Sequence, residues 1–308
     1  MMPTMKRGLL LLLFAVLLVG ASRSVGSSQP NLVRQIAPGV FYREAERDKR
    51  IIANTGWVVF RDYVLVIDAN FPWGARAILQ DLRKTTDKPI RFVFDTHYHS
   101  DHTFGNSVFT GAGATIICSE DCVAESRAKN TPAWARNKET GEYSLQPYRL
   151  EHPQIAFRDS MVLDDGTRRV EMTLAGPGHT RGDAVAYLPA ERILFTGDLC
   201  VNSAGNNIAD PDADPGNWVR ALDNLARKDI TIVVPGHGAQ GTAETIRGQR
   251  AYLADLIGQV RAGIARGATV DQLEKQIDLS RHRPWGEDPN RNRPAIRAVY
   301  AKFSRVHP

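Results

Sequence analysis

Short apolar runs rich in Val, Ile and Phe recur along the chain, each bounded by Gly, Pro or Asn. Their length and composition predict buried β-strands. The expected strands cover residues 51–60, 63–69, 91–95, 114–118, 170–174, 184–188, 193–195 and 230–234. Between them, apolar residues spaced three or four apart predict helices over residues 74–84, 120–134, 217–227, 242–266 and 294–303. Strands and helices that alternate in this way predict an α/β layered protein.

The first residues have the character of an export signal. Lys6 and Arg7 precede an apolar stretch that is followed by Gly20 and Ala21. We expect residues 1–21 to be a signal peptide and the mature protein to be periplasmic or secreted. The stretch is too short to span a bilayer comfortably, so no stable membrane insertion is expected after cleavage. An uncleaved N-terminal anchor is the alternative, and residues 22–308 are expected to form one domain with C-terminal helices.

The segment THYHSDHT concentrates metal-binding side chains in one short loop. It contains His97, His99, Asp101 and His102. Three of the eight histidines of the chain thus lie in this loop, together with one carboxylate. Imidazole and carboxylate groups bind Zn²⁺, and a set without thiolate also accepts iron or manganese. The alternative, capping or core histidines, does not account for such a concentration.

Three further candidates follow apolar runs and lie beside glycine. They are His179 in GPGHT, Asp198 in LFTGDLC and His237 in VPGHG. Glycine allows the backbone to approach closely or to adopt positive φ, which can aim a neighbouring side chain inward. The repeated order of strand, Gly-rich turn and ligand predicts one shared metal site.

These motifs together resemble those of the metallo-β-lactamase superfamily. The resemblance implies a four-layer αβ/βα sandwich with the metals at one edge. It also implies two ligand sets, His97, His99 and His179 for a first metal and Asp101, His102 and His237 for a second. Asp198 stands where glyoxalase-II-like and lactonase-like members have a bridging aspartate, whereas true β-lactamases usually have Cys or Ser there.

The resemblance implies hydrolysis that depends on two divalent ions, with Zn²⁺ expected and iron or manganese possible. Shared coordination lowers the pKa of water toward about 7, and the resulting hydroxide attacks an acyl carbon. Asp101 is the expected catalytic residue, because it can orient the hydroxide and carry a proton. A β-lactam or related cyclic amide is the first substrate class, and a lactone or other ester is the alternative. Two alternatives come from other functional classes. One is a persulfide dioxygenase that uses a single iron, and the other is a binding protein without catalytic activity.

Two polar loops, residues 130–153 and 202–215, and the segment Phe71-Pro72-Trp73 directly after a strand contain candidate substrate contacts. Trp73 and Trp134 can clamp the apolar face of a ligand, and Asn206 and Asn207 can supply hydrogen bonds. The alternative is that the aromatic residues pack their loops against the sheet. The expected partner is a small molecule, and the sequence does not determine the oligomeric state.

Charge and cysteine content add two open questions. The net charge is +5, and residues 280–308 contain seven Lys or Arg against two acidic residues. This segment is either a solvated helix face or a surface for anionic ligands or membranes, and it has no interleaved aromatic residues that would indicate nucleic-acid binding. Cys118 and Cys122 either pair or remain buried thiols, and Cys200, two residues after Asp198, is a candidate for a further metal ligand.

Overall fold

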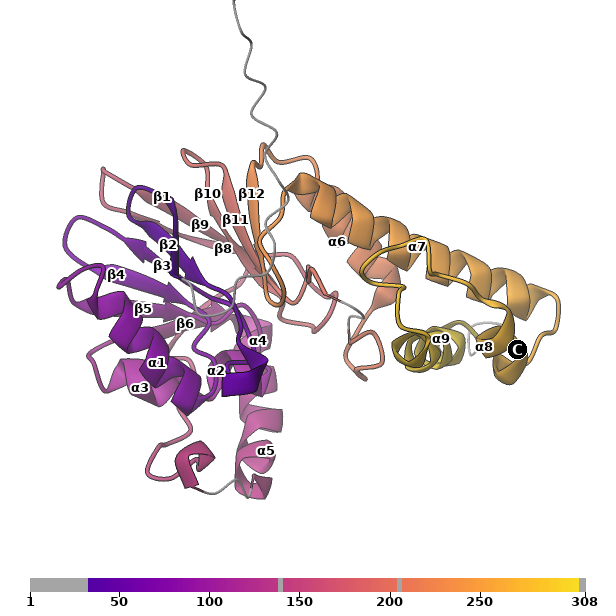
Figure 1. Ribbon diagram of the computed structural model, residues 1–308, viewed down its shortest axis with the longest axis horizontal. Coiled ribbons are helices and arrows are strands. Elements are labelled where there is room, and N and C mark those ends of the chain that lie inside the picture. Colours follow the sequence, from indigo (N-terminus) through magenta and orange to yellow (C-terminus); the bar gives the residue numbers. More distant parts are fainter. Residues whose placement is uncertain (1–32, 138–140, 204–206, 305–308) are drawn as a thin grey trace, which may run out of the picture.

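Two β-sheets face each other in the computed structural model, which describes residues 33–137, 141–203 and 207–304 (Figure 1). The first sheet follows chain order: β1 (Val33–Ala37), β2 (Val40–Arg43), β3 (Thr55–Val59), β4 (Val64–Ile67), β5 (Ile90–Phe94), β6 (Thr115–Ser119) and β7 (Ile155–Phe157). The second has the order β12 (Ile232–Pro235), β11 (Ile193–Gly197), β10 (Ala184–Leu188), β9 (Arg169–Leu174) and β8 (Ser160–Asp164). Strands β4 to β7 pair parallel, and so do β11 and β12, whereas the other pairs are antiparallel.

Helices cover the outer face of each sheet. On the first sheet these are α1 (Pro72–Arg83) and α3 (Asn106–Thr110), and on the second α6 (Pro215–Leu225) and α7 (Ala243–Ala265). The last helices, α8 (Val270–Gln276) and α9 (Pro289–Ser304), lie beside α7 (Figure 1). Shorter helical segments connect the strands: η1 (Arg47–Lys49), α2 (Ser100–Thr103), α4 (Glu120–Glu125), η2 (Ser126–Asn130), α5 (Thr131–Arg136) and η3 (Gly141–Tyr143).

Strand β4 explains why these apolar runs form buried strands. All four of its residues are buried, and successive side chains point to opposite faces. Val64 and Val66 pack among the residues of the α1 layer, whereas Leu65 and Ile67 pack in the core between the two sheets. A sheet that is covered on both faces therefore requires a continuous apolar run.

The predicted four-layer αβ/βα sandwich is confirmed. One apolar core lies between α1 and the first sheet, a second lies between the two sheets, and a third lies between the second sheet and its helices. The third core also includes Tyr252 of α7 and Ile296 and Val299 of α9. The C-terminal helices thus share a core with the sandwich, while the single-domain division at residues 22–308 stays a prediction.

Three predicted elements were wrong in their extent, and one of them, the helix expected over residues 294–303, already begins at Pro289. The strand expected over residues 51–60 begins only at Thr55, because Ile52 and Asn54 make hydrogen bonds to the loop after β12. The helix expected over residues 120–134 is interrupted by the π-turn η2, within which Asn130 donates to the Tyr98 carbonyl at 2.7 Å. Buried polar contacts of this kind override local periodicity, and π-turns are frequent near functional sites. The short strands β1, β2, β7 and β8 were not predicted, since they lack a long apolar run.

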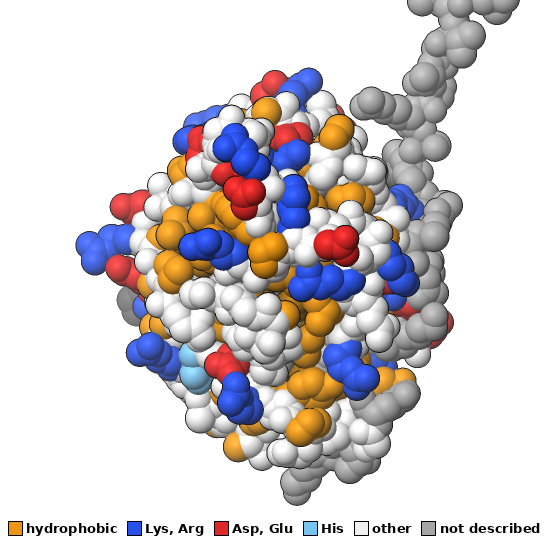
Figure 2. All heavy atoms as spheres, turned by 90° about the vertical axis from the view of Figure 1, so that its left-hand side faces the viewer, with side chains coloured by type: hydrophobic (Ala, Val, Ile, Leu, Met, Phe, Trp, Pro, Cys, Tyr) orange, Lys and Arg blue, Asp and Glu red, His pale blue; other side chains and the backbone are white. Residues whose placement is uncertain are grey.

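Within the described residues, no helix is long and apolar enough to cross a membrane. The proposed signal peptide, residues 1–21, lies outside the described residues. On the face shown in Figure 2, basic, acidic and apolar side chains are interspersed, and the described atoms of that face form no continuous basic area.

Candidate dinuclear metal centre

The ends of several strands meet at one edge of the sandwich and carry the predicted ligands. In the first sheet, β4 and β5 run parallel and are followed by Asp68 and by the segment that begins at Asp95. In the second sheet, β9, β11 and β12 share one direction, because β10 is antiparallel to β9 and β11 while β12 is parallel to β11. His179, Asp198 and His237 lie in the turns that follow these three strands.

Three histidines form the first triad. The Nδ1 atom of His99 lies 3.2 Å from His97 Nε2 and 2.9 Å from His179 Nε2. These atoms form one group within 4.8 Å of one another. His97 and His179 are almost fully buried, and His99 and His179 border the cavity described below.

A second triad combines Asp101, His102 and His237. The Asp101 Oδ2 atom lies 3.3 Å from His237 Nε2 and 3.7 Å from His102 Nε2. Helix α2 produces this arrangement locally, because it places the adjacent residues Asp101 and His102 at its first turn, directly after His99.

Asp198 lies between the two triads. Its Oδ1 atom is 3.3 Å from His102 Nε2 and 3.2 Å from His237 Nε2, and its Oδ2 atom is 3.6 Å from His179 Nε2. The two oxygens of one carboxylate thus face different triads, as a bridging ligand requires. This position matches the bridging role that the sequence resemblance implies.

Hydrogen bonds on the outer nitrogens orient the imidazole rings. The Nδ1 atom of His102 lies 2.9 Å from Asp68 Oδ2, and the Nδ1 atom of His97 lies 3.0 Å from Thr96 Oγ1. The Thr96 hydroxyl itself donates to Asp68 at 3.0 Å, so its oxygen is free to accept from His97. Each Nδ1 then carries the proton of the neutral ring, and the Nε2 lone pair is directed into the site.

The same relation holds for His99 and His237 with other acceptors. His237 Nδ1 lies 2.8 Å from the Ile52 carbonyl, and His99 Nε2 lies 3.1 Å from Asp210 Oδ2. Donation to these acceptors leaves His237 Nε2 and His99 Nδ1 as lone pairs that face the site. Four of the five histidines are therefore held in the tautomer that binds a metal, and the donor set fits two divalent ions of the zinc type.

The electrostatics of the protein chain also favour cations here. Burial lowers the pKa of His237, but the carboxylates of Asp198 and Asp101 outweigh it and raise that pKa to about 10. Burial also lowers the pKa of His102, but the neighbouring carboxylates, mainly Asp68, raise that pKa well above its usual range. Without metal, the carboxylates hold protons on these rings, and a divalent ion would displace them.

Two glycines give the ligand loops the space they need. A β-carbon at Gly236 would lie 2.0 Å from Asp198 Oδ1, and one at Gly197 would lie 2.2 Å from Thr96 Oγ1. Gly197 also has a φ of +50°, a region that other residues rarely adopt. The glycines of TGD and PGHG are thus required for close approach around Asp198.

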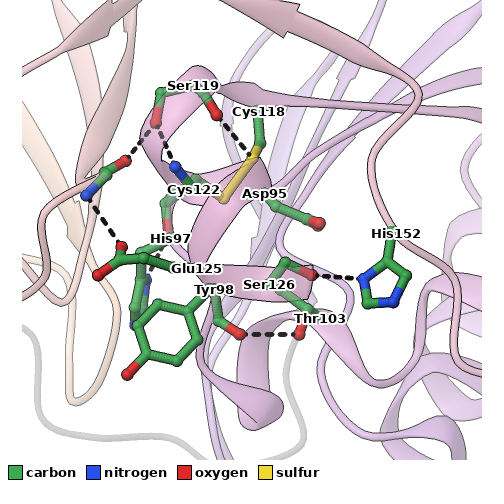
Figure 3. Close-up of a disulfide and its surroundings, with 12 residues drawn as sticks. Asp95, His97, Tyr98, Thr103, Cys118, Ser119, Cys122, Glu125, Ser126 and His152 are labelled. Carbon is green, nitrogen blue, oxygen red and sulfur yellow. Dashed lines mark hydrogen bonds between the residues drawn. A yellow bond between two sulfur atoms is a disulfide. The ribbon is translucent and has the colours of Figure 1, made fainter. Parts of the chain in front are cut away.

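A disulfide stabilises the wall behind His179. Cys118 and Cys122 are bonded, which decides the alternative that the sequence left open (Figure 3). Beside them, the Ser119 hydroxyl donates to the Gly182 carbonyl at 2.7 Å, and the Gly182 amide donates to Glu125 at 3.1 Å. The β6–α4 junction therefore holds the loop that carries His179.

Cys200 is a buried free thiol, and burial is the main cause that raises its pKa above the usual range. It belongs to none of the ligand groups found among the described residues. The geometry therefore gives no support to Cys200 as a metal ligand.

A cavity of about 190 Å³ opens onto the two triads. Its described lining consists of Arg47, His99, Asp101, His179, Asp198, Val201, Ser203, Asn207, His237 and Arg291. Val201 is the only apolar side chain in that described lining. The predicted contact Asn207 lies on the wall, whereas Asn206 lies outside the described residues.

The two predicted tryptophans are not brought to this cavity. Trp73 stacks on Phe71 with ring centroids 4.9 Å apart, and Trp134 contacts Phe104 edge-on at 5.0 Å. Phe71 and Phe104 also meet, at 6.0 Å, so the four rings form one chain of aromatic contacts. This cluster packs α1 and α5 against the residue that follows α2, which favours the packing alternative over substrate contact.

Sequence reasoning missed several residues of the site. Asp68 and Asp210 act on the outer nitrogens of the histidines, and Arg47 and Arg291 line the cavity. Asp68 had a signal, because it ends the apolar run VLVID in the same way that Asp198 ends its own. Arg291 belongs to the basic segment 280–308, whose role the sequence left open, and Asp210 and Arg47 lie in polar segments that no local pattern singles out.

The family model of the metallo-β-lactamase superfamily matches residues 49–237, which include every predicted ligand. The chain belongs to the metallo-β-lactamase superfamily. The metallo-β-lactamase from Pontibacter korlensis superposes with a TM-score of 0.57 at 21% identity, over 72% of this chain and 98% of that one. This superposition supports the same fold.

Two curated relatives are named for different reactions, one as an alkylsulfatase and one as a β-lactamase. A linear primary-alkylsulfatase from Pseudomonas sp. (strain ATCC 19151) is 24% identical over 245 residues, which are 68% of this chain. A metallo-β-lactamase type 2 from Bacillus sp. (strain 170) is 25% identical over 206 residues, which are 66% of this chain and 71% of the relative. The match covers 46% of the alkylsulfatase, so this chain corresponds to less than half of that protein.

Proposed function

We propose that this protein is an exported metal-dependent hydrolase that cleaves an acyl bond with two divalent ions, and that its substrate is a compact cyclic amide of the β-lactam type. The observation that carries the proposal is the position of Asp198, whose two oxygens face different triads. A single-iron dioxygenase needs only one triad, so a carboxylate between two triads favours the dinuclear reading.

The protein groups have separate roles in this proposal. The ions, when bound by the two triads and Asp198, supply Lewis acidity and lower the pKa of water. Asp101 lines the cavity and its side chain is 22% exposed, so the carboxylate that would bind the second ion also reaches the substrate. Asp210 and Asp68 keep His99 and His102 in the tautomer that leaves a lone pair facing the site.

The cavity supports a small and polar substrate. Its volume of about 190 Å³ is below that of ordinary drug-sized pockets, which begin at about 300 Å³. Since Val201 is the only apolar residue of the described lining, this wall offers little surface for a long alkyl chain. A cyclic amide fits these conditions, and a lactone fits them as well, in agreement with the aspartate at position 198.

The test is hydrolysis of a chromogenic cephalosporin by the zinc-loaded mature protein, with and without chelator. We expect turnover that chelation abolishes and that falls by roughly a thousandfold or more in Asp101→Ala and His99→Ala, since these remove a metal ligand. Both variants are expected to keep their circular dichroism spectrum. Retained activity in either variant, or turnover that chelator leaves unchanged, would contradict the assignment.

Sulfate-ester hydrolysis is the second candidate. It is favoured by the alkylsulfatase relative and by Arg47 and Arg291 on the cavity wall, which suit a sulfate group. Release of sulfate from 4-nitrophenyl sulfate or a short alkyl sulfate, in a preparation inactive on cyclic amides and lactones, would replace the first candidate. Oxygen consumption with one iron per chain would instead indicate the dioxygenase reading.

Export remains part of the proposal. The basic and apolar pattern of residues 1–21 supports it, and so does the Cys118–Cys122 disulfide, because such bonds persist in oxidising compartments. N-terminal sequencing of protein recovered from the periplasm or the medium is expected to begin at residue 22. Full-length protein in the cytoplasmic fraction alone would exclude export.

A further inference from the structure

We infer that Arg47 and Arg291 form an anion-recognition pair on the cavity wall, which selects substrates with a negatively charged group next to the bond that is cleaved. The inference rests on the proposed function, because it assumes a substrate held at the two triads. It assigns a role to part of the basic C-terminal segment that the sequence left open.

The two arginines come from opposite ends of the described chain. Arg47 belongs to η1, before the first sheet is complete, and Arg291 belongs to the first turn of α9. Both line the cavity that also contains His99, Asp101 and His237. A volume of 190 Å³ equals a sphere about 7 Å across, so a ligand that reaches the triads is within reach of the arginine side chains.

The segment that carries Arg47 is fixed relative to the metal ligands. Glu46 and Ile51 close the short loop around η1 with two backbone hydrogen bonds of 2.8 and 3.0 Å. The next residue, Ile52, accepts the hydrogen bond from His237 Nδ1 at 2.8 Å. The position of Arg47 is thereby linked to a residue of the second triad.

Helix α9 is anchored beside Arg291 in a similar way. The neighbouring residue Asn292 is 7% exposed, accepts from the Tyr252 hydroxyl at 3.1 Å and donates to the Gly286 carbonyl at 2.9 Å. Trp285, just before α9, donates to the carbonyl of the lining residue Val201 at 2.7 Å. These contacts hold the first turn of α9 at the cavity rather than in open solvent.

The charges of the two arginines are left available by their surroundings. In the part of the chain that the structure describes, no carboxylate lies within 4 Å of the Arg47 guanidinium, and Arg291 approaches only Asp288, at 3.9 Å with both side chains largely exposed. Other arginines are closely paired, for example Arg43 with Asp81 at 2.9 Å. An exposed pair at 3.9 Å contributes little, so a substrate anion competes with it easily.

The chemistry of the pair indicates the ligand class. Two guanidinium groups favour planar or tetrahedral oxyanions, that is a carboxylate or a sulfate, because each can donate two parallel hydrogen bonds. The expected substrate is therefore an acid whose reactive group lies within a few ångströms of that anion. Neutral esters or amides of the same skeleton are expected to bind less well.

The test measures binding and needs no turnover. The zinc-loaded protein is titrated calorimetrically with three hydroxamates, whose head groups coordinate metal equally: succinic acid monohydroxamate, its methyl ester, and 3-sulfopropanohydroxamate. We expect wild type to bind at least one of the two anions about tenfold more tightly than the ester. The stronger of the two anions identifies a carboxylate or a sulfate-like group as the ligand.

Variants then assign the preference to the arginines. In the double variant Arg47→Gln and Arg291→Gln, the ratio between anion and ester is expected to fall to about one, while ester binding stays unchanged. Arg293→Gln is the matched control, because Arg293 is exposed on the same helix but does not line the cavity. The double lysine variant, which keeps both charges, is expected to retain part of the ratio.

A wild-type protein without preference for either anion would overturn the inference, and so would a preference that survives in the double glutamine variant. Either result leaves the proposed function intact if cyclic amides are still hydrolysed. Conversely, a lost preference in the double variant together with inactivity on cyclic amides would support the anion pair and refute the substrate class.

Discussion

Replacement of Asp210 by alanine removes the acceptor for His99 Nε2, which lies 3.1 Å from Asp210 Oδ2. Burial raises the pKa of Asp210, but the hydrogen bond from His99 outweighs it and lowers that pKa to about 2. The carboxylate is thus ionised at neutral pH and accepts a charge-assisted hydrogen bond. Without it, the His99 proton is free to move to Nδ1, the atom that faces His97 and His179 in the first triad.

The expected magnitude follows from the partly buried setting. The side chains of His99 and Asp210 are 18% and 12% exposed, so solvent screens the bond only in part. A hydrogen bond to a charged group contributes about 1.5–3 kcal/mol. This equals a loss of roughly 10–150-fold in affinity at the first site, in line with the 10–100-fold typical of partners behind metal ligands.

The assay is a zinc competition titration that resolves two binding steps. Asp210→Ala is expected to weaken one step and leave the other within about threefold, because only the first triad contains His99. Asp210→Asn is expected to lose about tenfold, since its single amide oxygen can still accept from His99, whereas the charge is lost and so is the second oxygen, which accepts from the Asp212 amide at 2.9 Å.

Asp212→Asn is the control for loop displacement. Asp212 lies in the same loop and pairs with Lys129 and the Tyr98 hydroxyl, without contact to a metal ligand. Equal losses in the Asp210 and Asp212 variants would assign the effect to loop position. Unchanged zinc affinity in a folded Asp210→Ala protein would refute the reasoning.

Three further perturbations test other parts of the site. Gly236→Ala places a β-carbon 2.0 Å from Asp198 Oδ1, so the carboxylate must move, and we expect about a hundredfold loss of turnover with reduced zinc content by mass spectrometry. In the metal-free protein, the raised pKa of His237 stabilises the fold fully below about pH 6.5. That stability is lost as the pH rises toward about 10, so the thermal midpoint should fall over this range and fall less in His237→Gln. Removal of the disulfide by Cys118→Ala and Cys122→Ala opens a five-residue loop and should lower the free energy of unfolding by about 2 kcal/mol in urea titrations.

Each of these expectations has a control or an opposing result. Gly258→Ala in α7 has no atom within 4 Å of the added carbon and should raise stability by about 0.5–1 kcal/mol without loss of zinc. Equal behaviour of the Gly236 and Gly258 variants would contradict the packing argument. A thermal midpoint that does not change with pH in the metal-free wild type would contradict the role of His237. A double alanine variant of Cys118 and Cys122 that is as stable as wild type would contradict the stabilisation by the disulfide.

Much of the fold and the ligand set was available from local sequence. The buried strands were found because a sheet covered on both faces needs continuous apolar runs, as in β4 and β10. The ligands were found because the His-x-His-x-Asp-His run lies within one loop, and because glycine marks the turns at His179 and His237. Their role as metal ligands stays a prediction that the measured zinc stoichiometry will test.

The remaining features depend on contacts between distant segments. Asp210 lies 111 residues from His99 in the chain, and its loop has no periodicity that indicates a partner. The sequence predicts Trp73 and Trp134 as substrate contacts, yet in the fold Trp73 stacks on Phe71 and Trp134 packs on Phe104, and neither lines the cavity. A local pattern encodes the period of an element and the chemistry of a turn, but not which surface that turn will meet.

The sequence by itself determined the layered fold, the residue types of the candidate metal site and the strand ends at which they lie. Each of these features depends on residues that are close together along the chain. Only the tertiary structure decided the disulfide, the tautomers of the histidines and the meeting of Arg47 with Arg291 at one cavity. These depend on how sheets and helices pack, since packing brings together atoms whose separation along the chain leaves no local trace.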